Sequence, residues 1–167
     1  MINNKNLITL INTLKQHKIS IGSVESFTGG LFAATLTSVS GVSEVFRGSI
    51  VSYNEDIKEK VVGVKKSTIK KYTVVSSAVA EDMATEGAKV LGTDLTVSFT
   101  GNAGPSVCEG DKEVGLFYIS IYFQSIVYTV EKRLNLDRNE LREEAVNIAT
   151  KIILEILEKN NFLPHLF

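Results

Sequence analysis

The chain has few of the residues on which disulfide-stapled and multidomain proteins depend. Its 167 residues include one cysteine, Cys108, so no disulfide framework holds the fold, and a lone thiol suits a reducing compartment. With two prolines and no low-complexity segment, nothing suggests a linker between domains. The length is still sufficient to bury a sizeable core. We therefore expect a single domain over residues 1–167.

Strong charge of either sign and long apolar runs are also missing. Lysine and arginine (18) nearly balance aspartate and glutamate (19), which argues against nucleic-acid or polybasic membrane binding. The N-terminus lacks the apolar core of a signal peptide. The most apolar region, 114–130, is interrupted by polar residues and is rich in β-branched and aromatic ones, which favours strands over a membrane span. A cytoplasmic location is expected.

Several catalytic signatures are absent as well. The sequence has no P-loop, no GxGxxG and no paired cysteines. Its two histidines, His17 and His165, fall in the first predicted helix and in the tail, far from every glycine-bearing turn. This argues against a Ser-His-Asp triad and against a histidine-ligated zinc site. A hydrolase built on this chain needs a base other than histidine.

Hydrophobic periodicity predicts an α/β fold. We expect a single-domain three-layer sandwich in which a mixed β-sheet is flanked by helices. The apolar tail, 162–167, could dock on its own domain or on another subunit. The predicted helices lie near 4–17, 30–38, 54–62, 77–91 and 137–159, and the predicted strands near 19–24, 46–53, 95–99, 114–123 and 126–134.

The stretch 24–30 links a buried strand to an apolar helix through polar and small residues. It contains Ser26, Thr28, Gly29 and Gly30. Backbone N–H groups of such a turn can point at an anion or a developing oxyanion, and glycine lets a ligand approach. The alternative is an ordinary turn in which Ser26 or Thr28 caps the helix.

A second polar turn, 100–105, follows the strand 95–99, and ligands bind at the carboxyl edge of open α/β sheets. Ser43 lies on another turn, where it could face a ligand or cap a helix. Lys58 lies on a short predicted helix, where a lysine is usually solvated. Arg138 and Arg142 open the last helix against its macrodipole, which suggests an acidic or phosphorylated partner, or simply Asp137 as neighbour.

The motifs together resemble the C-terminal domain of CinA, whose stand-alone members are nicotinamide-nucleotide amidases, also called NMN deamidases. The resemblance covers nearly the whole chain, and the ESxTGG and TGxAGP motifs are its most specific part. The matching segments are 25–30, 41–43, 51–58, 62–64, 75–76, 100–105 and 114–115.

The resemblance implies hydrolysis of the carboxamide of nicotinamide mononucleotide (NMN) to nicotinate mononucleotide and ammonia, in pyridine-nucleotide salvage. The implied mechanism is of the Ser/Lys type and uses no metal and no cofactor. By motif, Ser43 is the nucleophile and Lys58 the base, although Ser26 lies on the better anion-binding turn and could itself be the nucleophile. The other implied catalytic residues are Ser26 and Tyr53, and the implied substrate-binding residues are Thr28, Gly29, Gly30, Thr100, Gly101, Asn102 and Arg138.

This mechanism makes a physical demand on the lysine. An ordinary lysine pKa of about 10.4 must fall by roughly two to three units, through burial or a nearby cation, before the amine can act as a base at neutral pH. Arg138 could supply that cation, or it could bind the substrate phosphate. Both roles stay open at the level of sequence.

Two departures from the family pattern leave the substrate range open. Residues 106–110 replace a glycine-rich stretch, and Gly41-Val42-Ser43 replaces a Gly-Ser-Ser turn. The alternatives are a non-catalytic nucleotide- or partner-binding module and an amidase for another small amide. Beyond the substrate we expect a homo-oligomer, with no nucleic acid and no membrane as partner, and none of the activity of the N-terminal domain of longer CinA proteins.

Overall fold

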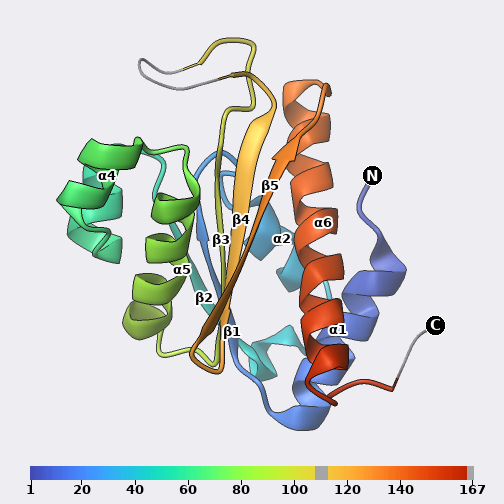
Figure 1. Cartoon of the computed structure of the whole chain (residues 1–167). Helices are drawn as coiled ribbons and strands as arrows, with labels where there is room; N and C mark the ends of the chain where they lie inside the picture. The colour runs from blue at the N-terminus through green and yellow to red at the C-terminus, as the bar shows by residue number, and fades with distance from the viewer. Residues whose placement is uncertain (108–112, 165–167) are drawn as a thin grey trace.

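A mixed five-stranded sheet with the order β2-β1-β3-β4-β5 forms the centre of the computed structural model, which describes residues 1–107 and 113–164 (Figure 1). β1 runs parallel to β2 and β3, whereas β4 is antiparallel to both β3 and β5. The strands are β1 (Ile21–Glu25), β2 (Phe46–Val51), β3 (Leu95–Gly101), β4 (Leu116–Phe123) and β5 (Ile126–Arg133).

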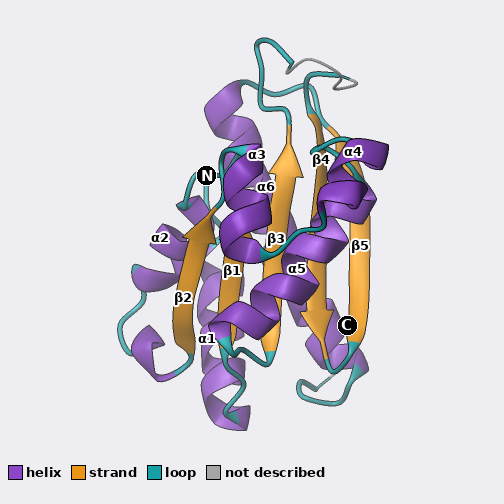
Figure 2. Ribbon diagram, turned by 90° about the vertical axis from the view of Figure 1, so that its left-hand side faces the viewer, coloured by secondary structure: helices purple, strands orange, loops and turns teal. Residues whose placement is uncertain are grey.

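Helices cover both faces of this sheet, as Figures 1 and 2 show from two sides, and the predicted three-layer α/β sandwich is confirmed. On one face lie α1 (Asn4–His17), α2 (Leu31–Thr37) and α6 (Arg138–Lys159). On the other face lie α4 (Lys66–Tyr72) and α5 (Ser77–Leu91). Short helical turns, η1 (Val42–Glu44), α3 (Glu55–Ile57) and the π-helical η2 (Lys58–Val62), complete the chain.

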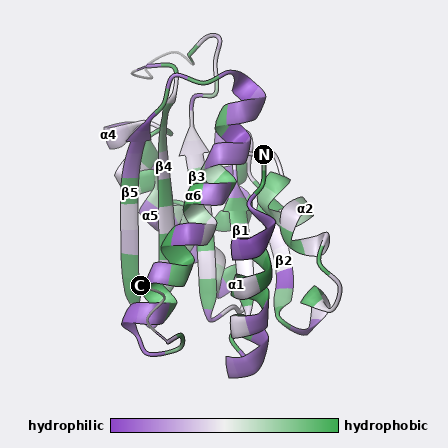
Figure 3. Ribbon diagram, turned by 90° about the vertical axis from the view of Figure 1, so that its right-hand side faces the viewer, coloured by the Kyte–Doolittle hydropathy of each residue, from purple (hydrophilic) through white to green (hydrophobic). Residues whose placement is uncertain are grey.

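The larger core lies between the sheet and the layer of α1, α2 and α6. Fully buried side chains such as Leu10, Phe32, Phe99 and Ile153 meet there. α6 alternates between hydrophilic and hydrophobic residues along its length in Figure 3, which is the pattern of a helix that buries one face only. Burial of this apolar stripe holds α6, and with it the residues of its first turn, against the sheet.

Helix boundaries follow the capping residues that the sequence supplies. The side chain of Asn3 accepts a hydrogen bond from Asn6 N at the start of α1, and that of Ser76 accepts one from Val79 N at the start of α5. Gly92 ends α5 in the left-handed conformation. The predicted extents of α1, α5 and α6 are confirmed to within two residues.

The structure differs from the prediction in three places. The helix expected over 54–62 is a short α-helix that passes into the π-helical turn η2, and α4 was not predicted at all. β4 begins at Leu116, because residues 114–115 form a turn before it. Cys108 and the rest of 108–112, and His165 with the end of the tail, lie outside the described residues.

The predicted hairpin and the tail can be followed over the described residues. The apolar region 114–130 forms most of the β4–β5 hairpin, and no helix within 1–107 or 113–164 is long and apolar enough to cross a membrane. In the tail, the ring of Phe162 packs on the same chain, 5.2 Å from the ring of His17 and 5.7 Å from that of Phe123.

The parallel half of the sheet brings three strand ends to one edge. β1, β2 and β3 run in the same direction, so the residues that follow them, from Ser26, Ser52 and Asn102 onward, lie side by side. The chain leaves β1 for β2 on one side and later returns as β3 on the other, which makes the end of β1 the switch point of the sheet. Ligands bind at such points in α/β folds.

Candidate active site

The turn after β1 carries Ser26 and is held by main-chain hydrogen bonds. Ser26 N donates to Phe99 O of β3 at 3.0 Å, and Gly29 N donates to Ser26 O at 2.9 Å. Gly29 and Gly30 have φ angles of +58° and +95°, which suit glycine and allow the chain to turn sharply into α2. The N–H groups of Phe27 and Thr28 donate to no acceptor among the described residues.

Lys58 reaches Ser26 from the helical segment that follows β2. It opens η2, and π-helical turns often occur at functional sites. Its side chain is only 2% exposed, and Nζ lies 3.0 Å from Ser26 Oγ. Nζ also donates to Ser52 O at 2.6 Å and reaches Tyr53 O at 3.4 Å. A lysine on a short helix is usually solvated, but this one is buried against the serine, as the role implied by the resemblance requires.

The two carbonyl contacts define what a neutral Lys58 can do. A carbonyl oxygen can only accept, so each of these contacts uses an N–H of the amine. A neutral amine carries a lone pair beside its two N–H groups, so a neutral Lys58 could take the proton of the Ser26 hydroxyl, which lies 3.0 Å from Nζ. A hydroxyl and an amine at this distance can act chemically as a nucleophile and its general base.

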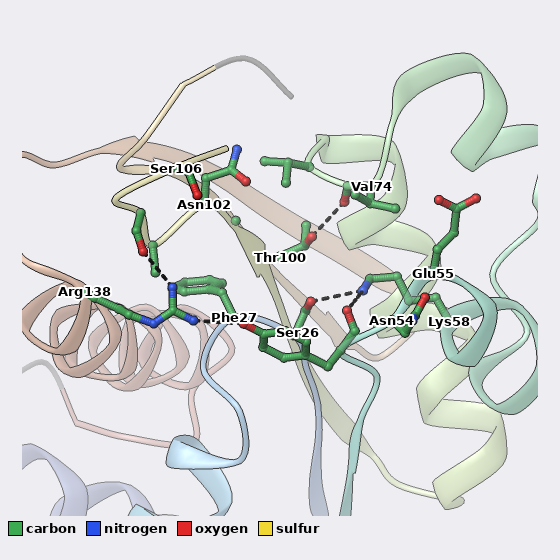
Figure 4. A pocket seen from close by; sticks show the side chains of 15 residues that line it. Ser26, Phe27, Asn54, Glu55, Lys58, Val74, Thr100, Asn102, Ser106 and Arg138 are labelled. Carbon is green, nitrogen blue, oxygen red and sulfur yellow. Dashed lines mark hydrogen bonds between the residues drawn. The ribbon is translucent and has the colours of Figure 1, made fainter. Parts of the chain in front are cut away.

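A cavity of about 420 Å³ opens beside this pair at the carboxyl edge of the sheet (Figure 4). Its walls come from the turn after β1, the segment after β2, the residues just before α5 and the loop after β3. Figure 4 shows Ser26 and Lys58 on one side and Arg138 on the other. The lining residues are Ser26, Phe27, Tyr53, Asn54, Glu55, Lys58, Val74, Val75, Thr100, Gly101, Asn102, Ala103, Gly104, Ser106 and Arg138.

Arg138 spans the cavity wall from the first turn of α6. Its Nη1 donates to Gly104 O at 2.7 Å, and its Nη2 donates to the hydroxyl of Tyr53 at 2.9 Å. Tyr53 itself is 59% exposed. The guanidinium thus connects the loop after β3 to the segment after β2, and it brings a positive charge to the cavity opposite the Ser26–Lys58 pair.

Thr100 and Asn102 fix the loop side of the cavity. The buried hydroxyl of Thr100 donates to Val74 O at 2.7 Å, which ties the segment before α5 to β3. Asn102 Nδ2 donates to Glu113 O at 3.3 Å, and the main chain of Asn102 bonds to Leu116 and Gly115. Gly101 lies between them on the cavity wall. These residues shape the cavity wall to which the family resemblance implies that the substrate binds.

Ser43 is not brought to this site. It lies in η1, just before β2, and β2 begins beside Ile21 at the opposite end of β1. The strands separate the two edges by about 15 Å at a rise of roughly 3.3 Å per residue. The expectation that Ser43 acts together with Lys58 is therefore corrected, because a residue that precedes a parallel strand lies at the edge opposite to one that follows it.

The remaining residues of the turn do not line the cavity with their side chains. Thr28 is fully buried, and its hydroxyl has no partner within the described residues. Gly29 and Gly30 shape the backbone and leave the wall to Ser26 and Phe27. Within 1–107 and 113–164, no group of three or more histidine, cysteine, aspartate or glutamate side chains is arranged to hold a metal ion.

Sequence reasoning missed the part played by main-chain oxygen atoms. Ser52 and Tyr53 contribute their carbonyl groups to Lys58, and side-chain chemistry gives no sign of this. Val74 and Val75 also line the cavity, although they read as ordinary apolar residues. Only the position of Ser52 in the sequence could have indicated this role, because Ser52 directly follows β2, whose carboxyl end lies at the same edge of the sheet as Ser26.

A family model described as the CinA C-terminal domain matches residues 4–157. The chain belongs to this CinA C-terminal domain family. A CinA-like protein of Flavobacterium psychrophilum is 39% identical over 153 residues, which are 92% of this chain and 37% of that protein. A CinA-like protein of Dictyoglomus turgidum is 42% identical over 133 residues, 80% of this chain and 32% of that protein. The chain therefore spans about a third of the length of these relatives.

Solved structures of the CinA superfamily share the fold over most of their length. The competence/damage inducible protein CihA of Agrobacterium tumefaciens is 28% identical with a TM-score of 0.86, and the match covers 90% of this chain and 93% of that one. A CinA superfamily protein of Klebsiella pneumoniae is 25% identical with a TM-score of 0.89, covering 94% and 99%. The matched fold thus accounts for nearly the whole chain in each of these two structures.

Proposed function

We propose that this CinA-family domain is a nicotinamide-nucleotide amidase, which hydrolyses NMN to nicotinate mononucleotide and ammonia. The observation that carries the proposal is the distance of 3.0 Å between Lys58 Nζ and Ser26 Oγ at the wall of the cavity. A buried amine beside a hydroxyl is the arrangement of a nucleophile with its general base. The substrate class comes from the family resemblance, and a cavity of about 420 Å³ is within the size range of small-molecule sites.

In the proposed mechanism, Ser26 Oγ attacks the carboxamide carbon while its proton passes to Lys58 Nζ. The tetrahedral intermediate then collapses, and ammonia leaves with the proton returned by Lys58. A water molecule cleaves the resulting ester on Ser26 by the same route, which regenerates the serine and releases the nicotinate product. Each step needs one base and one acid, and a single lysine can act as both in turn.

The surroundings of the pair support this chemistry. The N–H group of Phe27, a residue of the cavity wall, directly follows the nucleophile and has no acceptor among the described residues, so it is a candidate donor to the oxyanion. Arg138 provides a cation on the opposite wall, suited to the phosphate of a mononucleotide. Tyr53 and Phe27 offer aromatic surface to a pyridine ring.

The test is ammonia release from NMN by the purified protein after exhaustive chelation. We expect turnover by the wild type, and a loss of about a hundredfold or more in Lys58→Ala and Ser26→Ala. Lys60→Ala is the matched control for the lysine, since Lys60 is an exposed residue of the same turn that pairs with Asp56. Ser43→Ala is the matched control for the serine, and both controls should retain the wild-type rate.

Other outcomes lead to different conclusions. Wild-type turnover in Lys58→Ala would remove the lysine from the mechanism, and a loss confined to Ser43→Ala would restore the nucleophile implied by the motif. Folded wild-type protein that binds NMN but releases no ammonia would favour the binding module. Release from a different small amide, with none from NMN, would keep the amidase and change its substrate.

A further inference from the structure

Glu25 is a buried carboxylate that the proposed chemistry does not use. It is the last residue of β1, it is fully buried, and it does not line the cavity. Oε1 accepts a hydrogen bond from Phe32 N at 2.9 Å, and Oε2 accepts one from Ala33 N at 3.0 Å. The hydroxyls of Ser23 and Ser49 lie 3.1 and 3.2 Å from Oε2.

Such a group is costly to bury unless its partners are complete. Glu25 forms no ion pair with any described residue, so its charge is balanced by hydrogen-bond donors alone. Two of these are N–H groups in the first turn of α2, where unpaired N–H groups and the helix dipole favour a negative charge. Bonds between an ionised carboxylate and N–H groups are stronger than those between neutral groups.

These bonds tie together the two ends of the turn that carries Ser26. Glu25 immediately precedes Ser26, while Phe32 and Ala33 follow the turn in α2, so one carboxylate fixes both the entry and the exit of the chain. Arg142 holds the middle of the turn from α6, because its Nη2 donates to Thr28 O at 2.9 Å. The Ser26 hydroxyl and the free N–H groups of Phe27 and Thr28 lie between these anchors.

We propose that Glu25 is a positioning residue for the reaction, with Arg142 as a second anchor of the same turn. This inference rests on the proposed role of Ser26 as nucleophile. Glu25 acts through the turn, since its contacts are with α2, Ser23 and Ser49 rather than with Lys58 or the cavity. Its loss lets the serine and the oxyanion donors shift by a fraction of an ångström, which is sufficient to slow a reaction that depends on alignment.

The variant that tests this is Glu25→Gln. The amide keeps the size of the side chain but turns one acceptor oxygen into an NH₂ group, which then faces an N–H donor. Asp94→Asn is the matched control, because Asp94 Oδ2 also accepts from a main-chain N–H and a hydroxyl, those of Ser20, at 2.9 Å each. Asp94 is an exposed residue that precedes β3, and its partner Ser20 precedes β1, so the same carboxylate-to-amide change is made at the opposite edge of the sheet.

The readout is the rate of covalent labelling of Ser26 by a fluorophosphonate, located by mass spectrometry. In this step Ser26 Oγ bonds to phosphorus, fluoride leaves, and the hydroxyl proton passes to Lys58. The label needs an aligned nucleophile but no amide substrate. We expect Glu25→Gln and Arg142→Gln each to lower the labelling rate by about tenfold or more, with kcat on the amide falling in parallel and KM little changed.

Circular dichroism and thermal melting accompany every variant, and Asp94→Asn should label at the wild-type rate. If Glu25→Gln does not fold, the labelling rate of Arg142→Gln tests the anchoring of the turn, because the side chain of Arg142 is only partly buried and its replacement disturbs the core less. Wild-type labelling rates in folded variants would overturn the positioning role. Wild-type protein that labels at Ser26 but releases no ammonia from NMN would refute the proposed substrate and leave the inference intact, whereas absence of label at Ser26 would overturn both.

Discussion

Lys58 Nζ donates to Ser52 O at 2.6 Å and lies 3.0 Å from Ser26 Oγ, so one nitrogen contacts the chain ends of both β1 and β2. If this amine is the base, replacement by arginine should be as harmful as truncation, because a guanidinium stays protonated. We expect Lys58→Arg to lose about a hundredfold or more in turnover. The measurement is ammonia release at matched folded concentration. Lys60→Arg is the control, and an active Lys58→Arg would show that only positive charge matters.

Tyr53 and Arg138 should be energetically coupled, because Arg138 Nη2 donates to the Tyr53 hydroxyl at 2.9 Å. Arg138→Gln removes the cation, and we expect KM for a phosphorylated substrate to rise by about tenfold with a smaller change in kcat. In a double-mutant cycle with Tyr53→Phe, the two effects should deviate from additivity by roughly 0.5 kcal/mol or more. Strict additivity would mean that the contact does not contribute to binding.

Thr100 should stabilise the fold mainly through its hydroxyl, which donates to Val74 O at 2.7 Å. Thr100→Val keeps the shape but leaves this carbonyl without its donor, and we expect a loss of about 1–3 kcal/mol in the free energy of unfolding. Thr100→Ser keeps the hydroxyl and should lose less. Urea denaturation measures both variants, and equal losses would assign the role of Thr100 to its methyl group.

Tyr118 should make the stability of the protein sensitive to alkaline pH. Burial raises the pKa of Tyr118 to about 12, and the hydrogen bond from its hydroxyl to Glu131 at 2.8 Å acts in the same direction. The folded state therefore holds this proton more tightly than the unfolded state, in which the pKa is about 10. The resulting stability is complete below pH 10 and is lost as the pH rises towards 12.

The comparison with Tyr118→Phe isolates this contribution. Denaturant unfolding at several pH values between 9 and 12 should give a steeper loss of stability for the wild type than for the variant. Spectrophotometric titration of the folded protein should also lose its last-titrating phenol in Tyr118→Phe. Parallel stability curves for the two proteins would show that the phenol is not perturbed in solution.

Most of the fold could be predicted from the sequence because its helices are amphipathic and carry their own caps. Asn3 and Ser76 cap the starts of α1 and α5 with their side chains, and Gly92 ends α5 in the left-handed conformation, so these helix ends depend only on neighbouring residues. α4 was missed because it buries only Ile69 and carries no apolar stripe, so its helical state depends on packing beside α5. The π-helical turn was missed for a related reason, since no residue type encodes it.

The family resemblance supplied the residues of the candidate site but not their arrangement. Ser26, Tyr53, Thr100 and Arg138 were expected and lie at one cavity. Ser43 was expected there too, and topology explains the error, since its place before β2 sets it at the other edge of the sheet. The resemblance implied that Lys58 is buried or lies beside a cation, but its main-chain partners Ser52 O and Tyr53 O could not be predicted, because their positions depend on the folded chain.

Lys58 contacts the residues that follow two parallel strands, β1 and β2, so the reactivity of Ser26 depends on the correct pairing of these strands. A shift of β2 along β1 by one residue would move Ser52 and Lys58 by about 3.3 Å relative to Ser26 and separate amine from hydroxyl. Compact molecules with a shifted β2 would keep the circular dichroism of their helices and would unfold cooperatively, but their Ser26 would not react. A count of reactive serines therefore reports the fraction of a preparation in which the sheet is correctly assembled, a quantity that spectroscopy of secondary structure does not measure.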